Sequence, residues 1–218
     1  MNSNLLLGIK FFDEFAHLDD FMKGNIFFST SGSLSLGNNS EMNYNEFAVP
    51  IYKQELKING CALNPSMYSF YYEWQKHVPL FCFYTLDEKN YINDGSTSTI
   101  MIDSRFSIEG KKRFAAIFEL SDFMNRLDIA CQKKDCGYQL VKTKYFDFSS
   151  KNDEWLLDTS QDMYGFLKIH DSKHDYQNES RVILTDMLSE KPFLLPIGAW
   201  RNIPLQMKVQ NNKWHLFN

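Results

Sequence analysis

Residues 166–184 gather most of the side chains in this chain that could serve a reaction. The stretch passes from apolar residues through a run of charge and imidazole to an aromatic residue and a Gln-Asn-Glu tripeptide, directly before a β-branched segment. If the segment from Tyr176 onward forms a strand, alternation directs Gln177, Glu179 and Arg181 to one face. A carboxylate at the start of such a strand can accept a hydrogen bond from a sugar hydroxyl and stabilise positive charge that develops at an anomeric carbon.

Neighbouring residues could complete such a site. Tyr176 or another ring could stack on a planar leaving group, and Ser29 or Ser31, at the end of a second strand, could orient the carboxylate. An ordinary surface gives the same pattern, because Glu179 and Arg181 can form a solvated ion pair that contributes about 0 to 1 kcal/mol. A concave, ring-lined pocket around Glu179 favours chemistry, and a flat surface or full engagement with Arg181 favours a structural role.

Two histidines in the same stretch raise the question of a metal. His170 and His174 have the i, i+4 spacing that places two imidazoles on one face of a helix. Asp171, Ser172 and Asp175 disfavour a helix there, and no Glu takes the second position of the zinc-protease motif. We therefore expect histidines in a loop and no metal site. The glycine-rich phosphate loops GxxxxGK[ST] and GxGxxG are also absent from the sequence.

Composition and apolar runs predict a sheet-rich α+β fold. The chain has 19 Phe, 11 Tyr and 4 Trp, and rings suit a half-buried pleated surface better than a helix. Residues 78–86 are the best candidate for a buried central strand. Helical spacing predicts the clearest helix from an N-cap at Ser121 to a stop at Gly137, between strands at 114–118 and 138–148. We expect one domain, 1–218, with a mixed, mostly antiparallel sheet and a few packed helices.

The N-terminal segment predicts a strand, a helix and a second strand. Residues 5–12 form an apolar run, and a helical pattern then continues to Gly24, which is expected to end the helix. Residues 25–31 restart as a strand. Residues 32–45 are rich in Ser, Asn and Gly and predict a loop, either a functional lid or a disordered segment.

Charge and cysteine usage narrow the classes of partner and compartment. The formal net charge of -4 gives no whole-molecule field that would steer the chain onto nucleic acid. The four cysteines lack CxxC spacing and are expected to be reduced thiols. No stretch approaches the roughly 18 apolar residues of a membrane span, and the N-terminus lacks a signal-peptide pattern. These features predict a cytoplasmic protein that does not enter a membrane.

Two motifs resemble those of the ADP-ribosyltransferases, enzymes that transfer ADP-ribose from NAD. Tyr176-Gln177-Asn178-Glu179 is similar to their Gln/Glu-x-Glu turn, and Phe28-Ser29-Thr30-Ser31 is similar to their aromatic-Ser-Thr-Ser strand. The resemblance implies that Glu179 grips the nicotinamide ribose of NAD during cleavage and that Gln177 helps to place the acceptor. A broader likeness, over most of the chain, links it to a loosely defined group of bacterial and phage proteins with a Tyr-Gln-x-Glu-x-Arg motif.

The chain departs from the family's pattern in two places. The arginine class of these enzymes has an Arg on the strand before Ser-Thr-Ser, and this sequence has none before Arg105. Residues 29–31, and the second Ser-Thr-Ser at 96–98, are also separated from the Gln-x-Glu motif by far more residues than in the family. The resemblance then implies a histidine or aromatic in the first position, as in the diphtheria-like class. His77 and His17 are the candidates.

Two functions of different classes follow. The first is a toxin-like or phage-defence transferase that uses NAD as donor and a protein or nucleic acid as acceptor. The second is a non-enzymatic, phage-encoded inhibitor or defence component that binds a partner protein through exposed Tyr and Phe side chains. The surroundings of Glu179 discriminate between them.

Overall fold

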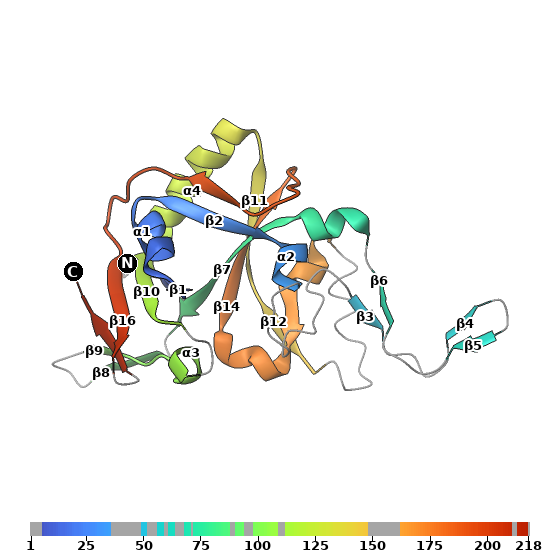
Figure 1. The fold of residues 1–218 in the computed structure, drawn as a ribbon, viewed down its shortest axis with the longest axis horizontal. Coiled ribbons are helices and arrows are strands. Elements are labelled where there is room, and N and C mark those ends of the chain that lie inside the picture. Colours follow the sequence, from blue (N-terminus) through green and yellow to red (C-terminus); the bar gives the residue numbers. More distant parts are fainter. Residues whose placement is uncertain are drawn as a thin grey trace.

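The structure, a computed structural model, describes residues 6–35, 49–51, 56–58, 61–63, 68–70, 72–87, 90–93, 98–108, 112–147, 162–210 and 213–217. These residues form an α+β fold around a nine-stranded sheet in which every pairing is antiparallel (Figure 1). One smaller pairing, between two short strands beside this sheet, is parallel. The expected fold class, a mixed and mostly antiparallel sheet with a few helices, is confirmed.

The strands of the large sheet are β1 (Leu7–Phe12), β2 (Asn25–Thr30), β7 (Pro79–Leu86), β10 (Phe114–Glu119), β11 (Gly137–Lys142), β14 (Glu179–Thr185), β15 (Phe193–Pro196), β16 (Leu205–Gln210) and β17 (Lys213–Leu216). The shorter strands are β3 (Val49–Ile51), β4 (Leu56–Ile58), β5 (Cys61–Leu63), β6 (Tyr68–Phe70), β8 (Tyr91–Asn93), β9 (Ser98–Ile100), β12 (Lys144–Phe146) and β13 (Ile169–Asp171). The α-helices are α1 (Phe15–Met22), α2 (Ser31–Ser35), α3 (Arg105–Ile108) and α4 (Leu120–Lys134), and the 3-10 helices are η1 (Glu73–His77), η3 (Gly165–Lys168) and η4 (Ser172–Gln177).

The central position of β7 follows from its sequence. The order of the sheet is β11-β14-β7-β1-β10-β16-β17, with β2 also paired to β7 and β15 paired to β2. Phe81 and Phe83 pack on one face of β7, while Leu80, Tyr84 and Leu86 pack on the other. A strand that is apolar on both faces can lie only where both faces are covered. The prediction of a buried central strand at 78–86 is confirmed.

Helices α1 and α4 cover one face of the sheet. On α4 the stripe Phe123, Leu127 and Cys131 is buried against the phenylalanines of β1, β7 and β10, and its burial contributes several kcal/mol at about 25 cal/mol per Å². The helix starts one residue before the expected cap and ends at Asp135, which adopts a left-handed φ of 54°. Gly137 does not close the helix as expected. It opens β11, where a Cβ would lie 2.5 Å from Oγ1 of Thr185.

Gly24 ends α1, as the sequence predicts. Its φ is +78°, and a Cβ on it would lie 2.0 Å from the carbonyl oxygen of Gly198. The amide of Ile197 also donates to the carbonyl of Gly24 at 2.8 Å. This close approach joins the α1–β2 turn to the segment after β15, so a side chain at position 24 would separate the two.

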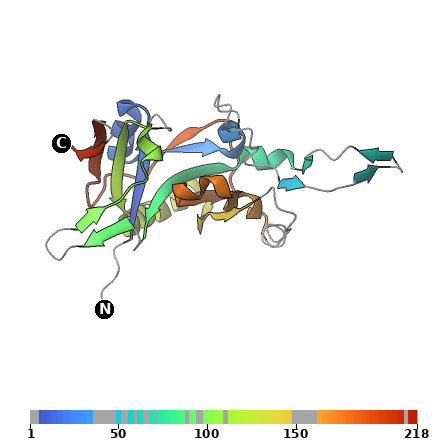
Figure 2. The same cartoon turned by 90° about the horizontal axis from the view of Figure 1, so that it is seen from below.

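The other face of the sheet carries smaller elements. The η3 and η4 turns and the parallel pair β12–β13 lie there, over β7, β11 and β14, and η3 contributes Phe166 and Leu167 to the core. The predicted strand at 138–148 is broken at buried Thr143 into β11 and β12. Strands β3 to β6 lie beyond one end of the sheet in both views (Figures 1 and 2). Of the expected loop at 32–45, residues 32–35 belong to α2, and 36–45 lie outside the described residues.

Candidate active site

The sheet contains a fork on one edge of β7. Strand β1 pairs with the C-terminal half of β7, from Tyr84 to Leu86, and β2 pairs with its first two residues, Pro79 and Leu80. Among the strands that the structure describes, the stretch Phe81 to Phe83 between them pairs with β14 alone, along its other edge. Figure 1 shows β1 and β2 meeting β7 toward opposite ends. We call this stretch the fork; it opens the sheet beside the first residues of β14.

Lys10 of β1 reaches into the fork. Its ammonium donates a hydrogen bond of 2.6 Å to the carbonyl of Cys82, a group that would otherwise face a neighbouring strand. The same nitrogen lies 4.8 Å from the centroid of the Phe81 ring. Burial lowers the pKa of Lys10 from its ordinary value of 10.5, and the nearby positive charge of Lys112 lowers it further. A cation is thereby held inside the sheet.

Glu179 begins β14 because the preceding residue turns the chain. The strand was expected from Tyr176, but residues up to Gln177 form the 3-10 helix η4, and Asn178 adopts a left-handed φ of 40°. The side-chain nitrogen Nδ2 of Asn178 donates to the carbonyl of Thr85 at 2.6 Å, and its side-chain oxygen accepts from Lys142 at 2.6 Å. This anchored turn interrupts the simple alternation and fixes the position of Glu179.

A buried arginine orients the carboxylate of Glu179. Arg181 donates from Nε to Oε1 of Glu179 and from Nη1 to the carbonyl of Leu167 at 3.0 Å. The side chains of Arg181 and Glu179 are only 1% and 12% exposed. The interpretation as a solvated surface pair is therefore wrong, because η3 covers the guanidinium. Among the described residues no donor contacts Oε2 of Glu179, so one carboxylate oxygen remains available to a ligand.

The backbone of Glu179 is also fixed. Its amide donates to the hydroxyl of Tyr145 at 2.9 Å. Burial raises the pKa of Tyr145, so this phenol stays protonated and neutral at physiological pH. Both ends of the residue are thus held by groups that do not titrate near neutrality, which is the preorganisation that a charge-stabilising carboxylate needs.

The carboxylate opens into a cavity of about 240 Å³, which we call the Glu179 pocket. It is lined by Ile9, Lys10, Phe11, Leu34, Cys82, Phe83, Tyr84, Phe106, Lys112, His170, His174, Gln177 and Glu179. The pocket combines four aromatic rings with two lysines, two histidines, an amide and a carboxylate. This is the concave, ring-lined setting that favours chemistry at Glu179. Gln177 lies in the same pocket although it precedes the strand.

The two histidines come from different elements. His170 lies on β13 and His174 on η4, with ring centroids 4.6 Å apart at a steep angle of 66°. They therefore do not share a helix face. Within the parts of the chain that the structure describes, no group of three His, Cys, Asp or Glu side chains is placed to hold a metal ion.

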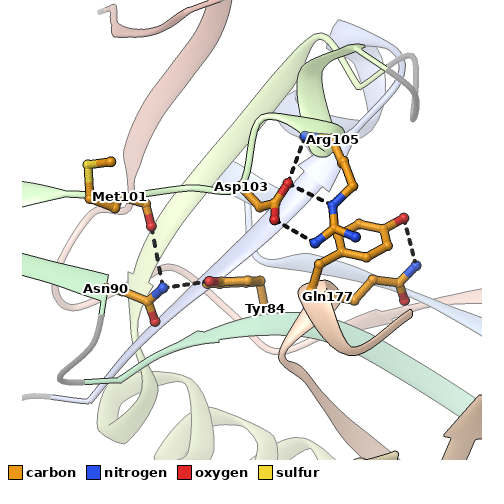
Figure 3. A network of polar contacts seen from close by, with 7 residues as sticks. Tyr84, Asn90, Met101, Asp103, Arg105 and Gln177 are labelled. Atoms are coloured by element: carbon orange, nitrogen blue, oxygen red, sulfur yellow. Dashed lines mark hydrogen bonds and ion pairs between the residues drawn. The ribbon is translucent and has the colours of Figure 1, made fainter. Parts of the chain in front are cut away.

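Tyr176 stands beside the pocket. Its ring lies 5.5 Å from that of Phe106, and the guanidinium of Arg105 lies over it at 3.8 Å from the centroid. Asp103 fixes Arg105 through two side-chain hydrogen bonds of 3.0 and 2.8 Å (Figure 3). Tyr176 thus supports the wall of the pocket through Phe106 and does not line the pocket itself.

A polar contact also holds Tyr84, whose ring lines the pocket. The hydroxyl of Tyr84 accepts a hydrogen bond of 2.6 Å from Asn90, whose amide also lies 3.4 Å from the carbonyl of Met101 (Figure 3). Burial raises the pKa of Tyr84. The ring that faces the cavity is therefore locked at its far end.

The two serines that were expected to orient Glu179 lie elsewhere. Ser29 is opposite Leu80, four residues along β7 from the level of Glu179, which corresponds to about 13 Å. Its hydroxyl bonds to Ser33 at 2.8 Å. Ser31 is fully buried and donates to the carbonyl of Gln75. Arg181, and neither serine, orients the carboxylate.

His77 is also placed outside the pocket. It ends η1, where its Nδ1 lies 3.7 Å from a carboxylate oxygen of Glu190. His17, the other candidate for the first position, lies on α1 and lines a different cavity, of about 680 Å³, together with Phe27.

Lys10, Lys112 and Phe106 were missed by the sequence-based interpretation. Lys10 gave a usable signal, because a lysine between Ile9 and Phe11 interrupts a strand that is otherwise apolar on both faces. Lys112 and Phe106 gave none, since only the fold brings them to Glu179.

Comparison of the chain with protein-family models, with curated proteins and with solved structures found no match. The helices that the structure describes include none with both the length and the apolar character to cross a membrane.

Proposed function

We propose that the Glu179 pocket cleaves the glycosidic bond between nicotinamide and ribose in NAD and transfers ADP-ribose to a protein or nucleic acid. The observation that carries the proposal is the position of Glu179, whose carboxylate is held by buried Arg181 and presents one oxygen to a ring-lined cavity. The resemblance of the Gln-x-Glu turn to that of ADP-ribosyltransferases supports it. Effectors of this kind, toxins and phage-defence proteins, act on macromolecules in the cytoplasm.

The residues fit the charges of this reaction. As the carbon–nitrogen bond breaks, its electron pair leaves with nicotinamide and positive charge develops on the ribose. Glu179 stabilises that charge, and the aromatic side chains of Phe11, Tyr84 and Phe106 form an apolar wall for the planar leaving group. The acceptor nucleophile then bonds to the same carbon and loses its proton. Gln177, at the edge of the pocket, is placed to orient the acceptor.

The experiment uses NAD labelled in the adenylate half, incubated with the purified protein and a cell lysate. Transfer predicts free nicotinamide together with label that stays on macromolecules. Digestion with protease or nuclease then removes the label and identifies the acceptor class. Wild-type protein that releases no nicotinamide and labels nothing would contradict the proposal.

A binding protein is the second candidate, and one surface feature favours it. Phe27 of β2 and Leu194 of β15 are direct cross-strand neighbours, and their side chains are 51% and 46% exposed. Among the described strands β15 pairs only with β2, so this apolar pair lies at a sheet edge. A partner protein could cover it. Protein that neither binds nor cleaves NAD but captures a defined partner through this edge would favour this function.

A further inference from the structure

Lys10 has no carboxylate in ion-pair contact among the residues that the structure describes. Its Nζ donates to the carbonyl of Cys82 at 2.6 Å and lies 4.8 Å from the centroid of the Phe81 ring. By contrast, several other lysines are each paired with a carboxylate: Lys23, Lys76, Lys112 and Lys168. A carboxylate partner keeps an amine protonated, whereas a neutral carbonyl holds the extra proton less strongly.

The surroundings of Lys10 favour the neutral amine. Burial lowers its pKa, and the positive charge of Lys112 lowers it further. Cys82, Glu179 and Asp13 act in the opposite direction, and burial outweighs them. A lysine that is desolvated in an apolar pocket beside another cation is the usual setting of an amine nucleophile. The neutral amine can still donate one N–H to the carbonyl of Cys82, and this contact directs its lone pair away from that carbonyl.

A ligand can reach Lys10 from two cavities. One is the Glu179 pocket, and the other is the cavity of about 680 Å³ that His17 lines, which we call the fork cavity. Lys10 lines both. Most of the wall of the fork cavity is apolar, with Phe12, Phe21 and Phe81 among its rings. An amine at the edge of such a cavity can meet a ligand whose body is apolar.

The Glu179 pocket contributes groups that can transfer protons to and from this amine. His170 and His174 line that pocket together with Lys10. An amine that attacks a carbonyl group loses protons, and the carbonyl oxygen gains them before it leaves as water. Imidazoles both accept and donate protons near neutral pH, so the pocket can serve both steps.

We propose that Lys10 is a carbonyl-binding amine, which forms an imine with an aldehyde whose apolar body lies in the fork cavity. The lone pair of Nζ bonds to the carbonyl carbon, the carbonyl electrons move to oxygen, and one proton passes from nitrogen to oxygen. The carbinolamine then expels its hydroxyl with a proton as water, and nitrogen gives up its remaining proton to form the C=N bond. Neither partner is oxidised or reduced. The reaction uses no NAD and does not rest on the proposed function.

Benzaldehyde is the probe, because it joins a reactive aldehyde to an apolar ring. The full chain is incubated with it at neutral pH together with cyanoborohydride, which delivers hydride to the imine carbon and makes the bond permanent. Peptide mass spectrometry then measures the rate of labelling at each lysine. Lys10 is expected to react at least about tenfold faster than Lys23. Lys23 is exposed, and its hydrogen bond to Asp19 raises its pKa.

The same experiment in urea is the control for the fold. Unfolding exposes both lysines, so the preference for Lys10 should disappear. Equal rates at Lys10 and Lys23 in the folded protein, or a preference for Lys10 that persists in urea, would overturn the proposal.

Substitutions at Lys112 test the environment of the amine. Lys112→Met removes the neighbouring charge and releases Asp13, so labelling of Lys10 should fall about threefold or more. Lys112→Arg keeps the charge, and Lys23→Met removes an exposed one; both should stay within about twofold of the wild type. Circular dichroism checks that each variant is folded. Wild-type labelling of Lys10 in folded Lys112→Met would contradict the proposal.

Glycolaldehyde tests the class of ligand, since it carries the same reactive group on a small polar body. The ratio of labelling at Lys10 to labelling at Lys23 should be at least about threefold higher with benzaldehyde, because only its ring gains from burial in the fork cavity. Equal ratios for the two aldehydes would overturn the assignment of an apolar ligand.

Discussion

At the scale of single residues, the pair formed by Glu179 and Arg181 carries two roles. The carboxylate neutralises a guanidinium that is 1% exposed, and it also faces the pocket. Removing one partner of a buried pair leaves the other charge without its counterpart, which costs more than the loss of a surface pair. A change at Glu179 is therefore expected to affect the stability of the fold as well as activity.

Glu179→Gln should lower the free energy of unfolding by about 1 to 3 kcal/mol, since the amide replaces a charge-assisted acceptor beside buried Arg181. Urea unfolding measures the change. Glu190→Gln, at a side chain 86% exposed, is the matched control and should stay within about 0.5 kcal/mol of the wild type. Equal values for the two variants would show that the buried pair contributes no more than a surface one.

Lys10 predicts a dependence of stability on pH. Its folded pKa lies below the ordinary 10.5 because the fork buries it. Between the folded pKa and 10.5 the unfolded chain binds more protons than the folded one, so the free energy of unfolding rises with pH in that window. Lys10→Met lacks this contribution. Urea unfolding from neutral pH toward 10.5 should therefore show wild type gaining stability relative to Lys10→Met, and a constant difference would contradict the burial of the charge.

At the scale of elements, α4 and the turn after α1 give the clearest tests. Leu127→Ala removes a fully buried side chain of α4 and should cost about 2 to 5 kcal/mol. Ile129→Ala, on the same helix at 53% exposure, should cost less than about 0.5 to 1 kcal/mol. Thermal and urea unfolding of both variants measure the contrast. Similar losses would mean that the packing face of α4 is assigned wrongly.

Gly24 tests the contact between the first turn and the segment after β15. Gly24→Ala places a methyl against the carbonyl of Gly198 in a left-handed conformation, and should cost more than about 1 kcal/mol. Gly198→Ala has a similar φ, +83°, but nothing within 4 Å of the added carbon. The difference between their unfolding free energies isolates the contact, and no difference would mean that the turn can move away.

The elements that the sequence predicted well are those with strong local signals. The apolar run of β7, the helical spacing of α4 and the glycine after α1 each decide a structure within a few residues. The start of β14 was predicted wrongly, because Asn178 takes a left-handed turn that depends on Thr85 and Lys142, both distant in sequence. A pattern of neighbouring residues does not include these distant partners, so it could not predict the turn.

The residues of the candidate site were likewise predicted correctly only where a local motif contained them. Gln177 and Glu179 were predicted from one short motif, and both line the pocket. Ser29 and His77 were inferred to be neighbours of that motif from chain order and resemblance. The structure places them elsewhere, because β1 and β2 divide one edge of β7 and it is Lys10 of β1 that faces the opening. That division depends on long-range pairing, which no local pattern reports.

At the scale of the whole molecule, the chain has a net charge of -4, but several cationic side chains lie close together at the fork. Lys10, Lys112 and Arg181 lie near the fork together with two carboxylates, those of Glu179 and Asp13. A small cluster that is partly withdrawn from solvent is screened less than exposed charges. The acidic composition therefore does not exclude a nucleotide as ligand.

Release of nicotinamide from NAD is the measurement that tests the central claim most directly. Wild-type protein should release it, Glu190→Gln should match the wild type, and Glu179→Gln should be slower by about 100-fold to 1,000-fold because the charge that stabilises the ribose cation is gone. The assay is run at a temperature where circular dichroism shows Glu179→Gln to be folded. Release by folded Glu179→Gln at the wild-type rate, or no release by wild type, would contradict the account.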